Sequence, residues 1–183
     1  MSFDAVRHSV LDGCALPAGA RALPFATRLV LRGGADVVAP VTQAFGVAPP
    51  TNPMGSAASG ERAALWMGPD EWLLIAEPGD GDLFSELETA LAGVFHTLVD
   101  VSHRQVALAL QGAGATRLLA SGCPLDLDLK AFPVGMVTRT LFVKAEIVLW
   151  RREETSFRLE VGRSFAPYVA HMLIEAARNR IGD

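Results

Sequence analysis

The chain has 183 residues, half of them hydrophobic, which is enough to bury the core of one compact domain or of two small halves. Its formal net charge is −4, and acidic and basic residues are interspersed, which argues against a concentrated basic surface for nucleic acid. No apolar run reaches the length of a signal-peptide core or a membrane span, so we expect no membrane partner. The high apolar content also predicts a surface that a protein partner covers.

The number and spacing of the cysteines indicate a reducing compartment. Cys14 and Cys123 are far apart in sequence and belong to no CxxC pair, so they predict neither a disulfide framework nor a cysteine-based metal site. Free thiols fit a reducing environment, and we expect a cytoplasmic protein.

The first predicted elements are a strand and a short helix. Residues 25–31 carry the β-branched and apolar pattern of a strand. Asp36 is the predicted N-cap of a helix that ends at Gly46, a position that tolerates positive φ. Residues 47–60 show neither strand nor helix period and predict an exposed loop.

A hairpin, a helix and a strand follow. Residues 63–67 and 71–76 read as strands, and Gly68-Pro69-Asp70 between them suits a tight reversal. Asp82 predicts the start of a helix, and residues 96–101 return as a strand. The order of this part is β-α-β-β-α-β.

The second part repeats a similar order. The predicted elements are a half-buried strand at 104–110, a helix within 112–122, paired strands at 137–143 and 145–151, a strand at 157–161, and a last helix capped by Ser164. The expected apolar stripe of that helix consists of Phe165, Val169, Met172, Leu173 and Ala176.

These patterns predict an α+β fold of two ferredoxin-like split β-α-β halves with mainly antiparallel sheets and helices on one sheet face. We divide the chain into an N-terminal extension (1–24), a first half (25–102) and a second half (103–183), which together form one compact unit.

Few residues suggest chemistry. Gly112-Ala113-Gly114 lies between a strand and a helix, but the third glycine of a dinucleotide fingerprint falls on Arg117, which indicates a tight turn instead. Asp126 and Asp128 alternate with leucines, so they are either a carboxylate pair or the wet side of an extended loop. The histidines lack the spacing of a helical metal-binding pair; they are His8, His96, His103 and His171.

The polar run Asp100-Val101-Ser102-His103-Arg104 lies at the junction of the halves. Ser102 and His103 are adjacent and point to opposite faces of extended backbone, which excludes a hydrolase triad. Capping and hydrogen bonding at the junction is the favoured role, with Asp100, His103 and Arg104 as candidate junction residues.

Large aromatic side chains are candidate anchors for a partner. Trp66, Trp150 and Tyr168 occur in alternating or helical patterns, where a place in the core and a place in an interface are both open.

Several long segments together resemble the gamma-subunit family of heterotetrameric sarcosine oxidase. The matching segments include Leu65-Trp66-Met67-Gly68-Pro69-Asp70-Glu71-Trp72, Asp100-Val101-Ser102-His103-Arg104-Gln105, Ser121-Gly122-Cys123-Pro124-Leu125-Asp126, Lys144-Ala145-Glu146-Ile147-Val148-Leu149-Trp150 and Arg163-Ser164-Phe165-Ala166-Pro167-Tyr168. The resemblance covers most of residues 25–178.

The resemblance implies a non-catalytic gamma subunit that assembles with alpha, beta and delta subunits. The complex would oxidise sarcosine to glycine, with hydrogen peroxide and either formaldehyde or 5,10-methylenetetrahydrofolate as products. It would carry FAD, FMN, NAD and tetrahydrofolate on other subunits and no cofactor on this chain. The isolated chain is expected to be inactive, with no catalytic, cofactor or metal residues of its own.

The family is also similar in fold to the folate-binding region of the glycine-cleavage aminomethyltransferase, whose Asp-x-Ser-His stretch is echoed at residues 100–103. An independent folate-binding protein of that type is therefore the alternative. The chain departs from that pattern at Val143-Lys144-Ala145-Glu146, where the paired catalytic aspartates are missing. Glu146 is one methylene longer, so it would have to reach the same point by a different path.

Overall fold

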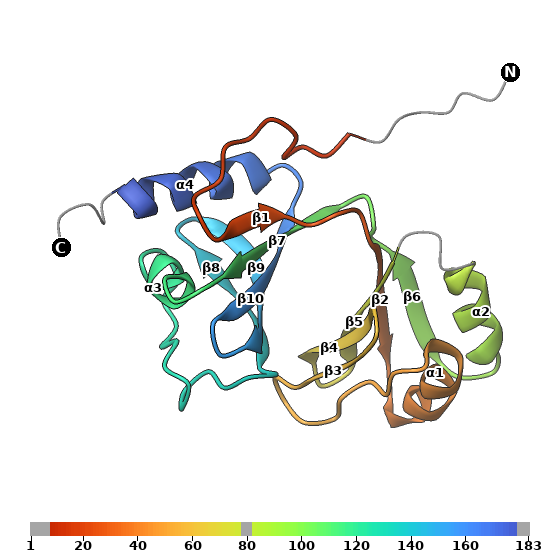
Figure 1. Cartoon of the computed structure of the whole chain (residues 1–183). Helices are drawn as coiled ribbons and strands as arrows, with labels where there is room; N and C mark the ends of the chain where they lie inside the picture. Colours follow the sequence, from red (N-terminus) through yellow and green to blue (C-terminus); the bar gives the residue numbers. More distant parts are fainter. Residues whose placement is uncertain (1–7, 78–81, 179–183) are drawn as a thin grey trace, which may run out of the picture.

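The computed structural model describes residues 8–77 and 82–178, which form two antiparallel sheets with helices on their outer faces (Figure 1). The first sheet has the strand order β3-β4-β5-β2-β6, and the second has the order β1-β7-β10-β9-β8. Both orders are a ferredoxin-like arrangement with one added edge strand, so the predicted α+β fold is confirmed.

The elements in chain order are β1 (Ala20–Ala22), β2 (Thr27–Gly33), a 3-10 helix (Ala35–Val37), α1 (Val38–Phe45), β3 (Ser56–Ser59), β4 (Arg62–Gly68), β5 (Glu71–Ala76), α2 (Leu83–Ala90), β6 (His96–Asp100), β7 (Gln105–Gln111), α3 (Ala115–Ala120), β8 (Val137–Phe142), β9 (Ala145–Glu153), β10 (Ser156–Gly162) and α4 (Ala166–Arg178).

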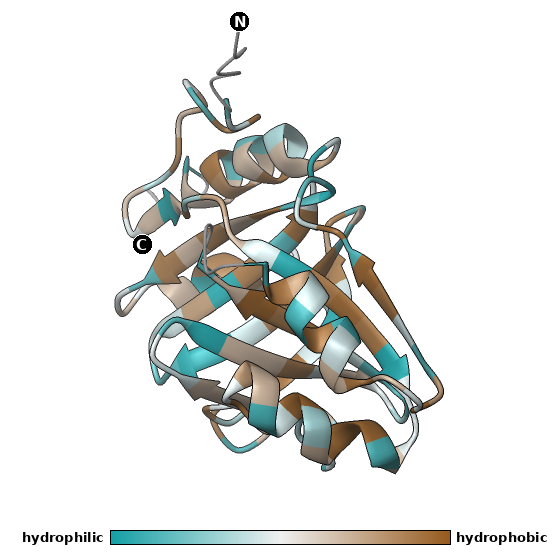
Figure 2. Cartoon of the chain, turned by 90° about the vertical axis from the view of Figure 1, so that its right-hand side faces the viewer, coloured by the Kyte–Doolittle hydropathy of each residue, from teal (hydrophilic) through white to brown (hydrophobic). Residues whose placement is uncertain are grey.

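Each sheet packs one set of alternating side chains against its own helices. Trp72 and Leu74 of β5 share a buried cluster with Phe45 of α1 and with the leucines of α2. Leu149 of β9 and Leu159 of β10 lie in the corresponding cluster under α3 and α4. Figure 2 shows this distribution as hydrophobic strands in the interior. Burying a large apolar side chain contributes about 1.5 to 3 kcal/mol, so these two cores hold the helices on the sheets.

The two sheets have equivalent strands at equivalent positions, but one of these strands comes from a different part of the sequence in each sheet. The position next to β2 is filled by β6, whereas the position next to β7 is filled by β1. Ala20 pairs with Leu110, and Leu11 is buried in the core of the second half. The segment predicted as an N-terminal extension therefore supplies a strand and a core residue to the second half.

Most predicted boundaries agree with the structure, and local signals explain why. Gly46 ends α1 with φ of 74°, the left-handed conformation expected there. Asp82 caps α2, since its Oδ1 accepts the Ser85 backbone N–H at 3.2 Å. The hairpin of β4 and β5 and the strands of the second half also lie where the sequence predicts them.

Two predictions in the first half were wrong. Residues 47–60 are not a structureless loop, because Ser56–Ser59 form β3 on the edge of the sheet, paired with β4. Asp36 does not cap α1, because it lies inside a 3-10 turn that precedes the helix and that begins without a side-chain cap. Alanine and serine carry a weak strand pattern, so pairing with β4 decides the conformation of β3.

The second half differs from prediction at two elements. Helix α4 begins at Ala166, so Ser164 lies two residues before it and Phe165, which is 51% exposed, is not part of its apolar stripe. Strand β7 is buried on both faces from Val106 to Leu110, not half-buried. The reason for the second difference is the packing of the two sheets against each other.

Candidate functional site

The inner faces of the two sheets meet in a third apolar cluster, here called the seam. It is built from residues of both halves: Ala63, Leu65, Leu73, Ile75, Val101, Val137, Val148 and Trp150. These positions alternate with those that face the helices, so both faces of β5 and β9 are buried. Trp150 is 6% exposed and lies between the halves.

A buried ion cluster crosses the seam. Arg28 of β2 donates from Nε to Glu160 of β10 at 2.6 Å, and both side chains are almost completely inaccessible. Arg158 donates from Nε to the other oxygen of the same carboxylate at 2.7 Å. Charge-assisted hydrogen bonds of this length are the strong ones, so Glu160 joins the two halves through charge as well as through packing.

The turn from β6 to β7 is the covalent junction of the halves, and its bonds reach both sheets. Asp100 Oδ1 accepts the Ser102 N–H at 2.8 Å, and Ser102 Oγ accepts the Arg28 N–H at 2.9 Å. The Arg104 carbonyl accepts the N–H of Arg163 at 3.0 Å. The bonds of this turn come from Asp100, Ser102 and the backbone, and the side chains of Asp100, His103 and Arg104 are exposed.

Beside the seam lies a groove of about 530 Å³. Its floor includes Leu73 and Val148, while Arg104 and Arg163 stand on its rim. Glu146 lines it as well, so the carboxylate one methylene longer than aspartate does face a cavity between the halves. Glu146 is exposed, and nothing in its surroundings gives it the desolvated setting that tunes a catalytic acid or base.

The other carboxylate pair considered from sequence has a structural role. Asp126 Oδ1 accepts the Asp128 N–H at 2.9 Å, and Asp128 Oδ1 accepts the Lys130 N–H at 2.9 Å. Both therefore stabilise successive turns of an exposed loop. The buried Arg151 holds this loop through the Leu127 carbonyl; burial lowers the pKa of its guanidinium, and the charges of Asp128 and Glu154 oppose that shift.

The predicted anchors lie in different environments. Trp150 is in the seam, Trp66 packs half-buried against the first core, and Tyr168 packs half-buried against the second. Among the described residues, the exposed large aromatics are phenylalanines: Phe95 at 93%, Phe165 at 51% and Phe84 at 37%. Phe95 and Phe84 were missed because a sequence pattern does not separate a buried aromatic from an exposed one.

Arg28 and Glu160 were also missed as partners. The available signal was a charge that alternates with apolar residues in each strand, and such a charge is costly to bury unless it is paired. Alternation alone predicts that such charged residues face solvent. They are buried here because a second sheet packs on that face.

Within residues 8–77 and 82–178, no helix is both long and apolar enough to cross a membrane. The same part of the chain holds no group of three or more His, Cys, Asp or Glu side chains placed for a metal ion.

Comparison with known proteins identifies the family. The sarcosine oxidase gamma subunit family matches residues 32–179. Two gamma subunits, from Corynebacterium sp. (strain P-1) and from an Arthrobacter species, are each 35% identical, and the matches cover 85% of this chain and 78% of each relative.

Solved structures agree with this family match. A chain of the heterotetrameric sarcosine oxidase from Corynebacterium sp. U-96 superposes with a TM-score of 0.86 at 29% identity, over 95% of this chain and 96% of that one. The glycine cleavage system aminomethyltransferase T from Bartonella henselae shares the fold, with a TM-score of 0.66 at 17% identity over 92% of this chain and 49% of that one. The chain therefore belongs to the sarcosine oxidase gamma subunit family.

Proposed function

We propose that this chain is the non-catalytic gamma subunit of a heterotetrameric sarcosine oxidase and that it supports assembly of the complex. The observation that carries the proposal is the match of almost the whole chain to a chain of a heterotetrameric sarcosine oxidase, at a TM-score of 0.86. The complex would contain alpha, beta and delta subunits, demethylate sarcosine oxidatively to glycine, and hold FAD, FMN, NAD and tetrahydrofolate outside this chain.

The polar groups of the chain support a structural role. Glu160 is shared by two arginines, Asp100 and Ser102 serve the junction turn, and the loop aspartates cap turns. Each of these groups is used within the fold, whereas a catalytic group must be directed at a reacting atom. We propose on the same grounds that the isolated chain is inactive, and from its two free cysteines that it works in the cytoplasm.

The partner surface would use exposed apolar side chains. Phe95 is 93% exposed, and Phe165 and Val99 lie together at the mouth of the groove, beside Arg104 and Arg163. Interfaces depend on a few aromatic and arginine anchors, which is the composition found at this mouth. Trp66 and Tyr168 are half-buried and would contribute only at their exposed edges.

Copurification tests the proposal. The tagged chain, isolated from its native host, should bring down flavoprotein subunits, visible as flavin absorbance, and the eluted complex should produce peroxide from sarcosine. The chain alone should be colourless and produce none. Peroxide formation by the pure chain, or its recovery without any flavoprotein, would contradict the proposal.

Titration with tetrahydrofolate separates the alternative function. An independent folate-binding protein should show saturable binding to the free chain, and Glu146→Ala should weaken it. We expect no saturable binding, because Glu146 is exposed and the other carboxylates that line the groove, Glu71 and Glu160, are already paired with arginines within the fold.

A further inference from the structure

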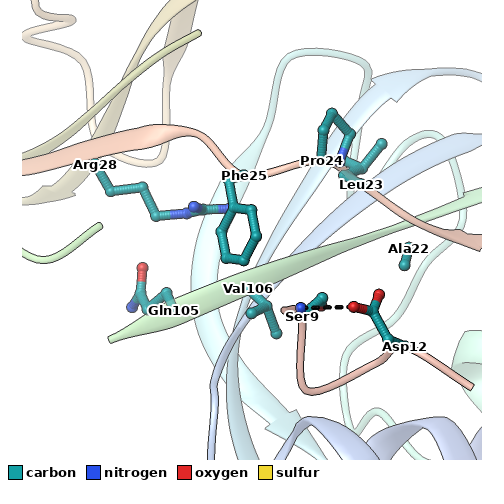
Figure 3. A pocket seen from close by; sticks show the side chains of 9 residues that line it. All are labelled: Ser9, Asp12, Ala22, Leu23, Pro24, Phe25, Arg28, Gln105 and Val106. Carbon is teal, nitrogen blue, oxygen red and sulfur yellow. Dashed lines mark hydrogen bonds between the residues drawn. The ribbon is translucent and has the colours of Figure 1, made fainter. Parts of the chain in front are cut away.

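A second cavity lies between the N-terminal segment and strands β2 and β7 (Figure 3), and Gln105 lines both this cavity and the groove. Its volume is about 310 Å³, the size of the smaller ligand pockets of proteins. Leu23, Phe25 and Val106 supply an apolar wall, and Arg28 and Gln105 supply polar groups. The cavity therefore combines an apolar wall with polar groups in about equal measure, a lining that suits a small polar ligand.

Two polar atoms at this cavity lack partners. Arg28 uses Nε for Glu160 and Nη1 for the Ala26 carbonyl at 3.1 Å, while its Nη2 is buried without a hydrogen bond. Gln105 Oε1 is buried without a hydrogen bond as well. Buried polar groups are nearly always satisfied, so an orphan donor and an orphan acceptor lining one cavity indicate a missing group.

The charge around the cavity favours an anion. Arg28 and Arg158 share the single carboxylate of Glu160, which leaves this buried cluster with an excess positive charge. The carboxylate that lines the cavity, Asp12, is 61% exposed and accepts the Ser9 N–H at 2.9 Å. A buried cation without a full partner is strongly unfavourable, so a carboxylate close to Arg28 would be stabilised.

We propose that this cavity binds a small carboxylate that carries an N–H donor next to its carboxyl group, the chemistry of a small amino acid. The carboxylate accepts from Arg28 Nη2, the nitrogen donates to Gln105 Oε1, and any side chain lies against Phe25 and Val106. A single molecule with both functions would satisfy the orphan donor and the orphan acceptor together.

Probes that differ in one function each test the proposal on the full chain. Glycine, acetate and methylammonium would be compared at equal ionic strength by saturation-transfer NMR and thermal shift. Glycine should bind about 10-fold more tightly than acetate, because it adds one hydrogen bond, and methylammonium should not bind. Gln105→Leu should reduce the affinity for glycine to that for acetate.

Blocking the cavity gives a test that leaves Arg28 intact. Ala22→Trp, which places an indole at the cavity wall, should abolish binding of glycine and acetate, whereas Ala58→Trp on the exposed edge strand β3 should change nothing. Arg28→Lys should weaken the binding of both carboxylates, glycine and acetate, if the variant folds. The proposal would be overturned if Ala22→Trp bound glycine and acetate as tightly as the wild type, or if glycine bound no more tightly than chloride. A crystal structure in which a water alone bridges Arg28 Nη2 and Gln105 Oε1 would overturn it as well.

Discussion

The ion cluster of the seam makes a quantitative prediction about Glu160→Gln. The wild-type carboxylate is 1% exposed and binds Arg28 at 2.6 Å and Arg158 at 2.7 Å, so its loss leaves one fully buried guanidinium and one mostly buried guanidinium without an anion. Removing one partner of a buried pair costs about 3 to 5 kcal/mol. We therefore expect Glu160→Gln to lower the free energy of unfolding by about 3 to 5 kcal/mol. The loss of a second ion partner does not double this cost, because Arg158 can partly recover hydration.

The double variant Arg28→Met/Glu160→Leu separates the cost of leaving a buried charge unpaired from the net contribution of the ion pair itself. Replacing both members of a buried pair by apolar residues of similar volume is often neutral. In this double variant only Arg158, whose side chain is 14% exposed, is left without its anion, whereas Glu160→Leu alone also leaves the fully buried Arg28 unpaired. The double variant should therefore be more stable than Glu160→Leu alone by at least about 1 kcal/mol. Urea unfolding of the full chain, followed by tryptophan fluorescence, measures both values, and Trp150 in the seam reports separation of the halves.

An exposed pair provides the control. Glu175 and Arg178 on α4 are 2.8 Å apart, with side chains 36% and 67% exposed. Glu175→Gln should cost only about 0.2 to 0.5 kcal/mol. If Glu160→Gln costs no more than the control, or the double variant is no more stable than the single one, the cluster does not hold the halves together.

Three further predictions test other parts of the chain. Trp150→Ala should destabilise the free chain by about 3 to 5 kcal/mol in urea, whereas Phe95→Ser should leave it folded and lower the recovery of the complex in copurification. Ser102→Ala should cost about 1 kcal/mol through the lost bond to the Arg28 N–H, and His103→Ala, with an exposed side chain, less than about 0.5 kcal/mol. Bonds from the Ser85 hydroxyl and N–H hold the pKa of Asp82 below its usual value, so the cap stabilises α2 above the unfolded-state pKa and is lost as pH falls through the lower folded-state pKa. The protection of the Ser85 amide, relative to its intrinsic exchange rate at each pH, should fall with acidification in wild type and not in Asp82→Asn.

Elements with local signals were predictable. Gly46 and Asp82 fix their helix ends by backbone conformation and capping, and the turn at residues 68–70 fixes the register of its hairpin. Strand β3 and the start of α1 carry no such signal, because their conformation depends on a neighbouring strand and on a preceding 3-10 turn. Local chemistry thus explains both the agreement and the errors.

The candidate residues were less predictable because their roles depend on which surface the second sheet covers. Arg158 and Glu160 alternate with apolar residues, which is the pattern of a strand with one wet face, yet that face meets β2 of the other half. His103 and Arg104, two of the candidate junction residues, are exposed, and the turn's backbone and Ser102 make the connecting bonds. Tertiary packing therefore decides the environment of these charged side chains.

The strand beside β7 is β1, at the position that β6 occupies beside β2, and this difference explains how two similar halves form one unit. Each half supplies the strands and helices of its own layer, but the strand beside β7 comes from residues that precede the first half in sequence. Residues 23–26 then lead from β1 directly into β2, so the chain crosses from the second sheet to the first at the position of the ion cluster and of the cavity that Arg28 lines. Because Arg28 lies immediately after this crossing and its partner Glu160 lies on β10, the first and last strands of the two layers are fixed to each other by charge. A fold closed in this way holds its halves together through the crossing, the junction turn and the seam at once, which is the rigidity that the proposed structural subunit would bring to an assembly.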